Sequence, residues 1–85
     1  MKKLVEQVDG EGLEALLGEN VLLMCANYFY HGKLVGVNET CVLLDGTKIV
    51  YDTGSWSAKE WQFAEDLPGA WYVQVGFIES FGRAK

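Results

Sequence analysis

The chain has 85 residues, of which 49% are hydrophobic and 13% aromatic, and its formal net charge is −5. This length predicts one small domain, and the acidic balance argues against non-specific binding to phosphate, because such affinity rises with the number of basic contacts. The two cysteines form no CxxC pair and the chain has one histidine, so the sequence predicts no zinc site.

The cysteines, the N-terminal segment and the longest apolar run indicate where in the cell the protein is expected. Cys25 and Cys41 both lie in apolar runs, which favours buried thiols, with a disulfide as the alternative. Glu6 interrupts the N-terminal segment, so no signal peptide is expected. The apolar run over residues 21–26 is too short to span a membrane. We therefore expect a soluble, cytoplasmic protein.

The first third of the chain predicts a helix and a strand. Residues 1–9 fit either a short helix or an extended arm. Leu13, Leu16 and Leu17 share one helical face, and Gly18 follows as a left-handed C′ residue, so a short amphipathic helix is expected over residues 12–17. Residues 20–25 are apolar on both faces, which is typical of a buried strand.

The centre of the chain predicts three further strands. Ala26-Asn27 is expected to turn the chain, since Asn tolerates a positive φ. A second strand follows over residues 28–38, bent at Gly32 and Gly36. Asp45-Gly46 stands between apolar runs, and this pattern indicates a type I′ hairpin between a third strand over residues 40–45 and a fourth over 47–52.

The last third predicts a helical turn and a closing strand. Residues 57–60 match a capping box, so a short helix that includes Trp61 and Ala64 is expected before Pro68-Gly69. Residues 71–81 alternate with period two and predict a fifth strand. Its inward side chains are expected to be Trp71, Val73, Val75 and Phe77.

Together these elements define a mainly β fold class in one domain over residues 1–85. It consists of a short N-terminal helix followed by a strongly bent five-stranded antiparallel sheet or small barrel. With so few strands, either the sheet closes or its edges need partners.

The stretch His31-Gly-Lys-Leu-Val-Gly-Val-Asn38, with Leu43-Leu44, resembles the Sm-like family (Sm, LSm and bacterial Hfq). Gly32, Leu34 and Asn38 fall on the glycine, leucine and aspartate positions of its first motif. Val50-Tyr51 is similar to the pair that opens the second motif in Hfq. The resemblance covers about residues 13–54, and the chain departs from the family through an insertion at about residues 55–70.

The resemblance implies a homo-oligomeric ring in which the fourth and fifth strands of neighbouring subunits pair, and it implies binding of single-stranded RNA. Several contact residues are replaced. The Sm asparagine that reads the base corresponds to Val42, and the stacking arginine corresponds to Tyr51. The inner-rim aromatic residue of Hfq corresponds to Thr40, and its Lys-His pair corresponds to Asp52 and Thr53. Altered specificity is therefore expected.

The residues that could contact RNA form two groups under this resemblance. The first group would lie at the pore rim, and the second would lie on the strand-two face that binds A-rich RNA in Hfq, where aromatic rings could stack on bases. The alternative for these tyrosines is a role in the core or the ring interface. The rim group is Asn38, Thr40, Tyr51 and Thr53, and the strand-two group is Tyr28, Tyr30 and His31.

No catalytic arrangement is expected, since His31 has no spaced nucleophile partner and no glycine-rich phosphate loop is present. The sequence also predicts no cofactor. Two functions remain. One is an RNA-binding ring with altered specificity, which is slightly preferred. The other is a ring-shaped assembly or adaptor protein that binds protein partners through the Trp-rich insertion; in that insertion Trp56 and Trp61, like Trp71, are expected to cover the barrel or form an interface.

Overall fold

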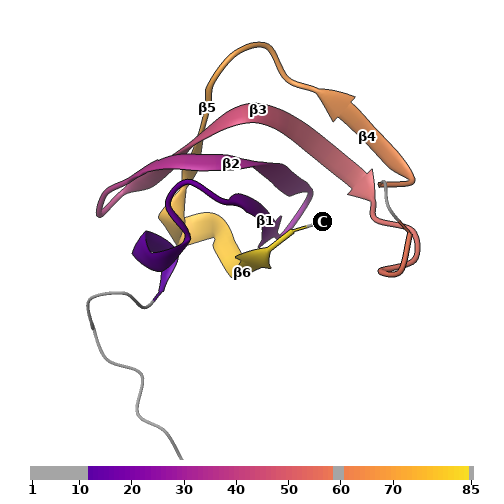
Figure 1. The fold of residues 1–85 in the computed structure, drawn as a ribbon, viewed down its shortest axis with the longest axis horizontal. Coiled ribbons are helices and arrows are strands. Elements are labelled where there is room, and N and C mark those ends of the chain that lie inside the picture. Colours follow the sequence, from indigo (N-terminus) through magenta and orange to yellow (C-terminus); the bar gives the residue numbers. More distant parts are fainter. Residues whose placement is uncertain (1–11, 59–60, 85) are drawn as a thin grey trace, which may run out of the picture.

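The computed structural model describes residues 12–58 and 61–84. These residues form a mainly β fold with six strands in one antiparallel sheet and two short 3₁₀ helices (Figure 1). None of the described helices is long and apolar enough to cross a membrane. The elements in chain order are η1 Leu13–Leu16, β1 Asn20–Cys25, β2 Phe29–Val37, β3 Cys41–Asp52, β4 Phe63–Asp66, β5 Trp71–Gln74, η2 Val75–Phe77 and β6 Ile78–Arg83.

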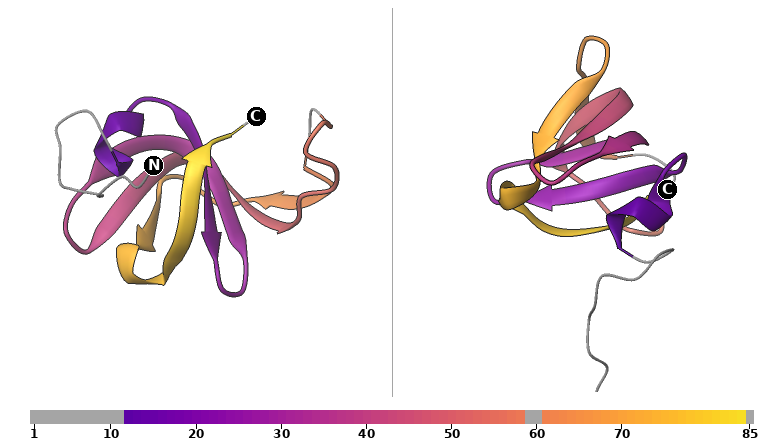
Figure 2. Two further views of the ribbon diagram at one scale, coloured as in Figure 1. Left: turned by 90° about the horizontal axis from the view of Figure 1, so that it is seen from below. Right: turned by 90° about the vertical axis from the view of Figure 1, so that its left-hand side faces the viewer.

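The sheet is built around the long strand β3. Its first half pairs with β5 and its second half pairs with β4, while its other edge pairs with β2 along its length. The strand order is β4-β3-β2-β1-β6, with β5 beside β3. Figure 2 shows how strongly the strands curve, so that the last strand returns to β1.

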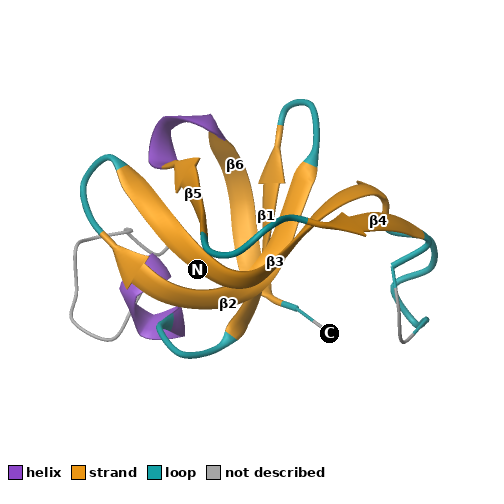
Figure 3. Ribbon diagram, turned by 90° about the horizontal axis from the view of Figure 1, so that it is seen from above, coloured by secondary structure: helices purple, strands orange, loops and turns teal. Residues whose placement is uncertain are grey.

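Of the two expected forms, the bent antiparallel sheet is confirmed, with six strands instead of five, and the small barrel is wrong. Consecutive strands β5 and β6 are joined by η2 (Figure 3), yet β5 pairs only with β3 and β6 only with β1 among the described strands. The seam between β5 and β6 therefore stays open. The curvature still encloses a core of fully or almost fully buried side chains: Val21, Leu23, Leu34, Val42, Leu44 and Val73.

The predicted hairpin at Asp45-Gly46 is also wrong, because β3 runs straight through it. A type I′ turn needs a positive φ at both central residues, and only glycines have a positive φ in the described part of the chain. Gly46, with φ 60°, instead forms a bulge in which Gly46 and Thr47 face the single residue Gly32 on β2. The predicted bend at Gly32 is confirmed, since the register shifts there.

The N-terminal helix is shorter than expected. Only the four residues Leu13–Leu16 form a 3₁₀ helix, and no side chain caps it. Leu13 and Leu16 pack against the core, whereas Leu17 is 47% exposed. Gly18 has the predicted positive φ, at 87°, but the Asn27 backbone does not. The expectation for residues 1–9 lies outside the described residues.

Two predictions in the last third need correction. The expected helix after Ser57 is absent from the described residues, where Phe63–Asp66 forms strand β4 instead. Glu60 of the capping box lies outside the described residues. The expected strand over residues 71–81 is split by η2, so Phe77 is 67% exposed instead of inward. The predicted strand over residues 20–25 is confirmed with the same bounds.

Candidate functional site

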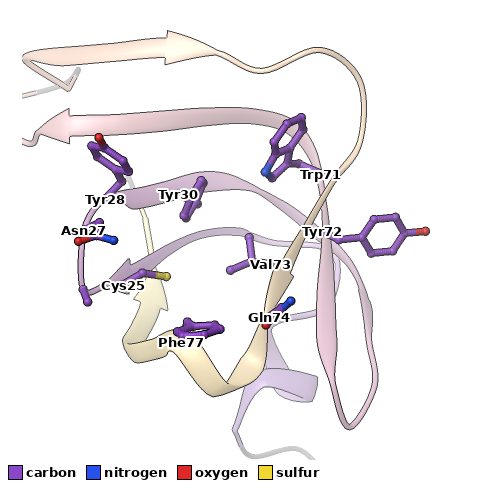
Figure 4. Close-up of a pocket in the computed structure, with 10 residues that line it drawn as sticks. Cys25, Asn27, Tyr28, Tyr30, Trp71, Tyr72, Val73, Gln74 and Phe77 are labelled. Carbon is purple, nitrogen blue, oxygen red and sulfur yellow. The ribbon is translucent and has the colours of Figure 1, made fainter.

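A groove lies at the open seam, between the β1–β2 turn and strand β5. It encloses about 410 Å³, which falls in the range of roughly 300–1,000 Å³ typical of ligand pockets. In Figure 4 the side chains of Cys25, Tyr30, Val73 and Phe77 gather around the middle of the groove, whereas Tyr72 points away from it. The lining residues are Cys25, Ala26, Asn27, Tyr28, Tyr30, Trp71, Tyr72, Val73, Gln74 and Phe77.

The composition of this groove is aromatic and neutral. Five of the lining side chains are aromatic, and none carries a formal charge at neutral pH. Phe77 is 67% exposed and Trp71 37% exposed. A small domain that leaves so much aromatic surface open at one concave place presents a surface suited to binding rather than to its own stability.

Local packing explains how the sequence builds the groove. Val73 is buried in the core, and two further side chains pack against this core: Val75, the first residue of η2, and Ile78, which follows η2. Because Val75 and Ile78 both turn inward, Phe77 between them is left outward. On the opposite side, the amide of Cys25 donates a hydrogen bond to the carbonyl oxygen of Tyr28 at 3.2 Å, which closes the β1–β2 turn.

Strand β5 offers an open backbone edge at the same place. The amide of Val75 donates to the Thr40 carbonyl at 2.9 Å, and Val73 lies directly opposite Val42. Hydrogen-bonding direction alternates along an antiparallel strand, so Val73 bonds toward β3 while the N–H and C=O groups of Tyr72 and the N–H of Gln74 face away from it. The carbonyl of Gln74, the N-cap residue of η2, accepts the first bond of that helix. No other described strand pairs with that edge.

Two carboxylates interact with residues of the groove wall or with their neighbours. Burial raises the pKa of the Cys25 thiol above its ordinary value of 9.0, and the charge of Glu79 adds to that increase. The Tyr51 hydroxyl donates to Glu65 at 3.3 Å, and the Tyr51 ring meets Tyr28 edge-on with centroids 5.3 Å apart. Burial, followed by this carboxylate, raises the pKa of Tyr51.

Burial also raises the pKa of Tyr30, and the nearby Cys25 and Tyr28 groups add to the effect. The thiol and the phenol of the groove therefore both favour their neutral forms. Charge that enters this groove must come from the ligand.

The basic side chains of the described residues lie elsewhere. They are Lys33, Lys48 and Arg83. Lys48 forms an ion pair with Asp66 at 2.7 Å, and Arg83 forms one with Glu19. The described carboxylates outnumber them: Glu14, Glu19, Glu39, Asp45, Asp52, Glu65, Asp66 and Glu79.

The sequence-predicted rim residues are divided between the two ends of β3. Asn38 and Thr40 belong to the β2–β3 turn, where the Asn38 side-chain oxygen accepts bonds from the amides of Thr40 at 2.8 Å and Cys41 at 2.9 Å. That oxygen is therefore engaged in shaping the turn. Tyr51 and Thr53 lie at the other end of β3, where the Thr53 hydroxyl donates to the Gly54 carbonyl at 3.1 Å.

The strand-two residues are likewise divided. Tyr30 packs against the core and lines the groove, and Tyr28 lines it at the turn. Successive residues of a strand point to opposite faces, and His31 accordingly meets Trp61 on the other face, with ring centroids 5.4 Å apart. The structure thus brings Tyr28, Tyr30 and Tyr51 close together, and it does not gather the seven predicted residues into one site.

The inserted segment reaches over that other face of the sheet. Trp61 contacts both His31 and Trp56 edge-on, the latter with centroids 6.1 Å apart. Trp56 in turn lines a smaller cavity of about 180 Å³ together with Leu22, Met24 and Phe81. These tryptophans therefore lie away from the groove.

Sequence reasoning missed the groove wall formed by Trp71, Gln74 and Phe77. Its one signal is that residues 71–78 contain no charge, which is unusual for an exposed strand.

Among the described residues, no cluster of three or more His, Cys, Asp or Glu side chains could hold a metal ion. Comparison with protein-family models, curated proteins and solved structures finds no match for this chain.

Proposed function

We propose that this protein is a small β adaptor module that binds a segment of another protein in the groove between the β1–β2 turn and β5. The observation that carries the proposal is the groove itself: its walls are aromatic and uncharged, and it coincides with an unpaired strand edge. Aromatic walls supply apolar contact area, and the tyrosine hydroxyls and the Asn27 and Gln74 amides supply hydrogen bonds. Recognition sites for peptides combine these features.

Electrostatics favour a protein partner over RNA. Phosphate contacts by Lys and Arg dominate nucleic-acid affinity, and no lysine or arginine lines the groove. Glu79 follows the sheet partner of Cys25, and Glu65 accepts from Tyr51, whose ring contacts Tyr28. A phosphate backbone that approached this surface would meet negative charge, whereas an uncharged or basic peptide would not.

The test is selection from a random peptide library displayed on phage, with the immobilised protein as bait. Phe77→Ala removes an exposed groove ring, and Phe63→Ala removes an exposed ring from β4, outside the groove. We expect recovered peptides to bind the wild-type protein and Phe63→Ala alike, and to bind Phe77→Ala at least tenfold more weakly. Failure to recover any peptide that depends on Phe77 would refute the proposed function.

An RNA-binding ring of the Sm-like type is the second candidate. It is favoured by the strand order, in which the four consecutive strands β1 to β4 pair in sequence and the last strand returns to β1. The open edges of β5 and β6 would join neighbouring copies, and Tyr28 with Tyr51 could stack on bases. Light scattering would report a ring as a multiple of the 9.5 kDa chain mass. Anisotropy with labelled U-rich and A-rich RNAs, at low and near-physiological salt, would report RNA binding.

A further inference from the structure

We infer that the partner segment binds as an added antiparallel or parallel strand on the open edge of β5, and that it is basic. This inference rests on the proposed function and names the class of ligand: an extended peptide that alternates apolar and cationic side chains. Three independent features of the described residues lead to it, namely the composition of the edge, the direction of its backbone groups and the charge around the groove.

The composition of the free edges singles out β5. Soluble proteins protect exposed edge strands with charged side chains, because an unprotected edge pairs with other chains. Strand β4 has the sequence FAED and carries two carboxylates, and β6 has the sequence IESFGR with Glu79 and Arg83. Strand β5 has the sequence WYVQ and carries no charge. Of these free edges, β5 is therefore the least protected against pairing with a further strand.

The backbone direction shows what the added strand would bond to. Tyr72 presents its N–H and C=O groups away from β3, and Gln74 presents its N–H, whereas the Gln74 carbonyl precedes η2 and accepts the first bond of that helix. Strand β5 therefore offers two donors and one acceptor to an added strand. A strand beside β5 would direct every second side chain toward the face on which Val73 lies. Those side chains would enter the groove between Tyr30 and Phe77, and main-chain bonds with alternate side-chain pockets are the usual basis of strand addition.

Charge selects a basic segment over a second copy of this chain. Glu79 follows Ile78, which pairs with the groove residue Cys25. Glu65 accepts from Tyr51, whose ring contacts the groove residue Tyr28. The lining residues offer no charge of their own. A second copy would bring a net charge of −5 to a surface that is already acidic. A segment with Lys or Arg at its solvent-facing positions would meet complementary charge, which raises both association rate and specificity.

The experiment uses synthetic peptides and the ¹⁵N-labelled protein. The first peptide alternates Lys or Arg with Val, and its control alternates Glu or Asp with Val. We expect the basic peptide to bind at least tenfold more tightly than the acidic one, and to shift the amide resonances of Tyr72 and Gln74. Equal binding of the two peptides, or shifts confined to other strands, would overturn the inference.

Backbone methylation of the basic peptide tests the strand pairing directly. Two versions carry N-methyl groups on the odd or on the even residues, and in an added strand only one set of amides faces β5. We expect one version to lose affinity by about tenfold, since it loses its hydrogen bonds to β5, and the other to bind normally. If both versions bind normally, the peptide does not pair as a strand.

The protein offers a matched substitution on its own edge. Gln74 has φ −74°, which suits proline, and its N–H faces away from β3. Gln74→Pro therefore removes an edge donor at little cost to the fold, and Gln74→Ala keeps the donor while removing the side chain. We expect basic-peptide affinity to fall several-fold more in Gln74→Pro than in Gln74→Ala. Equal affinities would overturn the strand pairing.

The outcomes separate this inference from the proposed function. Selected peptides that depend on Phe77 but show no basic preference would leave the adaptor function standing and overturn the inference. Concentration-dependent shifts at Tyr72 and Gln74 without any peptide would assign the edge to a second copy and overturn it too. If selection also recovers nothing, both ideas fail.

Discussion

Gly32 should tolerate an added side chain poorly, because it lies against the backbone of β3. A Cβ atom there would lie 3.0 Å from the Asp45 carbonyl oxygen, 3.2 Å from Leu44 Cβ and 3.3 Å from Thr47 Cα. These atoms belong to the β3 bulge and move only if the bulge moves. Crowding of this kind costs about 1–3 kcal/mol, and the lower entropy of unfolded alanine returns roughly 0.4–1 kcal/mol.

We therefore expect Gly32→Ala to lower the free energy of unfolding by about 1.3 kcal/mol. For a domain of this length, that loss corresponds to a fall in Tm of about 8 °C. Urea and thermal unfolding followed by tryptophan fluorescence measure both quantities.

Gly36→Ala is the matched control, because Gly36 lies on the same strand and an added Cβ would be 3.5 Å from Leu43 Cβ, an ordinary contact. It should be neutral or slightly stabilising. If the two variants unfold within about 0.5 kcal/mol of each other, the bulge is not held by the close approach of Gly32, and the reasoning fails.

Three further predictions concern the core and the ionisable groups. Leu23→Ala empties a fully buried site and should cost about 2–5 kcal/mol. Val35→Ala, at a 45% exposed position, should change the free energy of unfolding by under about 0.5 kcal/mol in the same urea titration. The pKa values of Cys25, Tyr30 and Tyr51 are raised in the folded protein, so the unfolded chain loses these protons at a lower pH than the folded chain does. The free energy of unfolding should therefore have its full value below about pH 9 and should fall as the pH rises through the folded-state pKa values. A Tm that stays constant from pH 7 to pH 11 would contradict this. Iodoacetamide at pH 8 should modify Cys25 more slowly in the folded protein than in urea, because the thiolate reacts, and mass spectrometry would reveal equal rates if burial had no effect.

The parts of the fold that sequence could predict are those set by local pattern. The apolar run of β1 has one interpretation, and the structure confirms it. The pair Asp45-Gly46 has two interpretations, because a glycine with a positive φ occurs both in hairpin turns and in bulges. What decides between them is Gly32, which lies opposite and leaves room for two residues to face one. That information lies on another strand, so a local pattern cannot contain it.

The candidate site was less predictable for the same reason. Tyr28 and Tyr30 were identified through the family resemblance, but their partners Trp71 and Phe77 come from the far end of the chain. Strict alternation over residues 71–77 predicts that Trp71 and Phe77 point inward with Val73. It fails because Val75 and Ile78, three residues apart, both reach the core, a spacing that suits a 3₁₀ turn and not a strand.

That turn links the two halves of the proposed binding surface. If β5 and β6 formed an ordinary hairpin, β6 would occupy the edge of β5, and the groove would be filled by the chain itself. Instead β6 is committed to β1, with Cys25 opposite Ile78, and η2 carries the chain across the seam. The same burial of Val75 and Ile78 that leaves the β5 edge open also turns Phe77 outward opposite Tyr30. An unpaired edge and an aromatic wall are thus two results of one packing choice, which is why we assign them to one ligand.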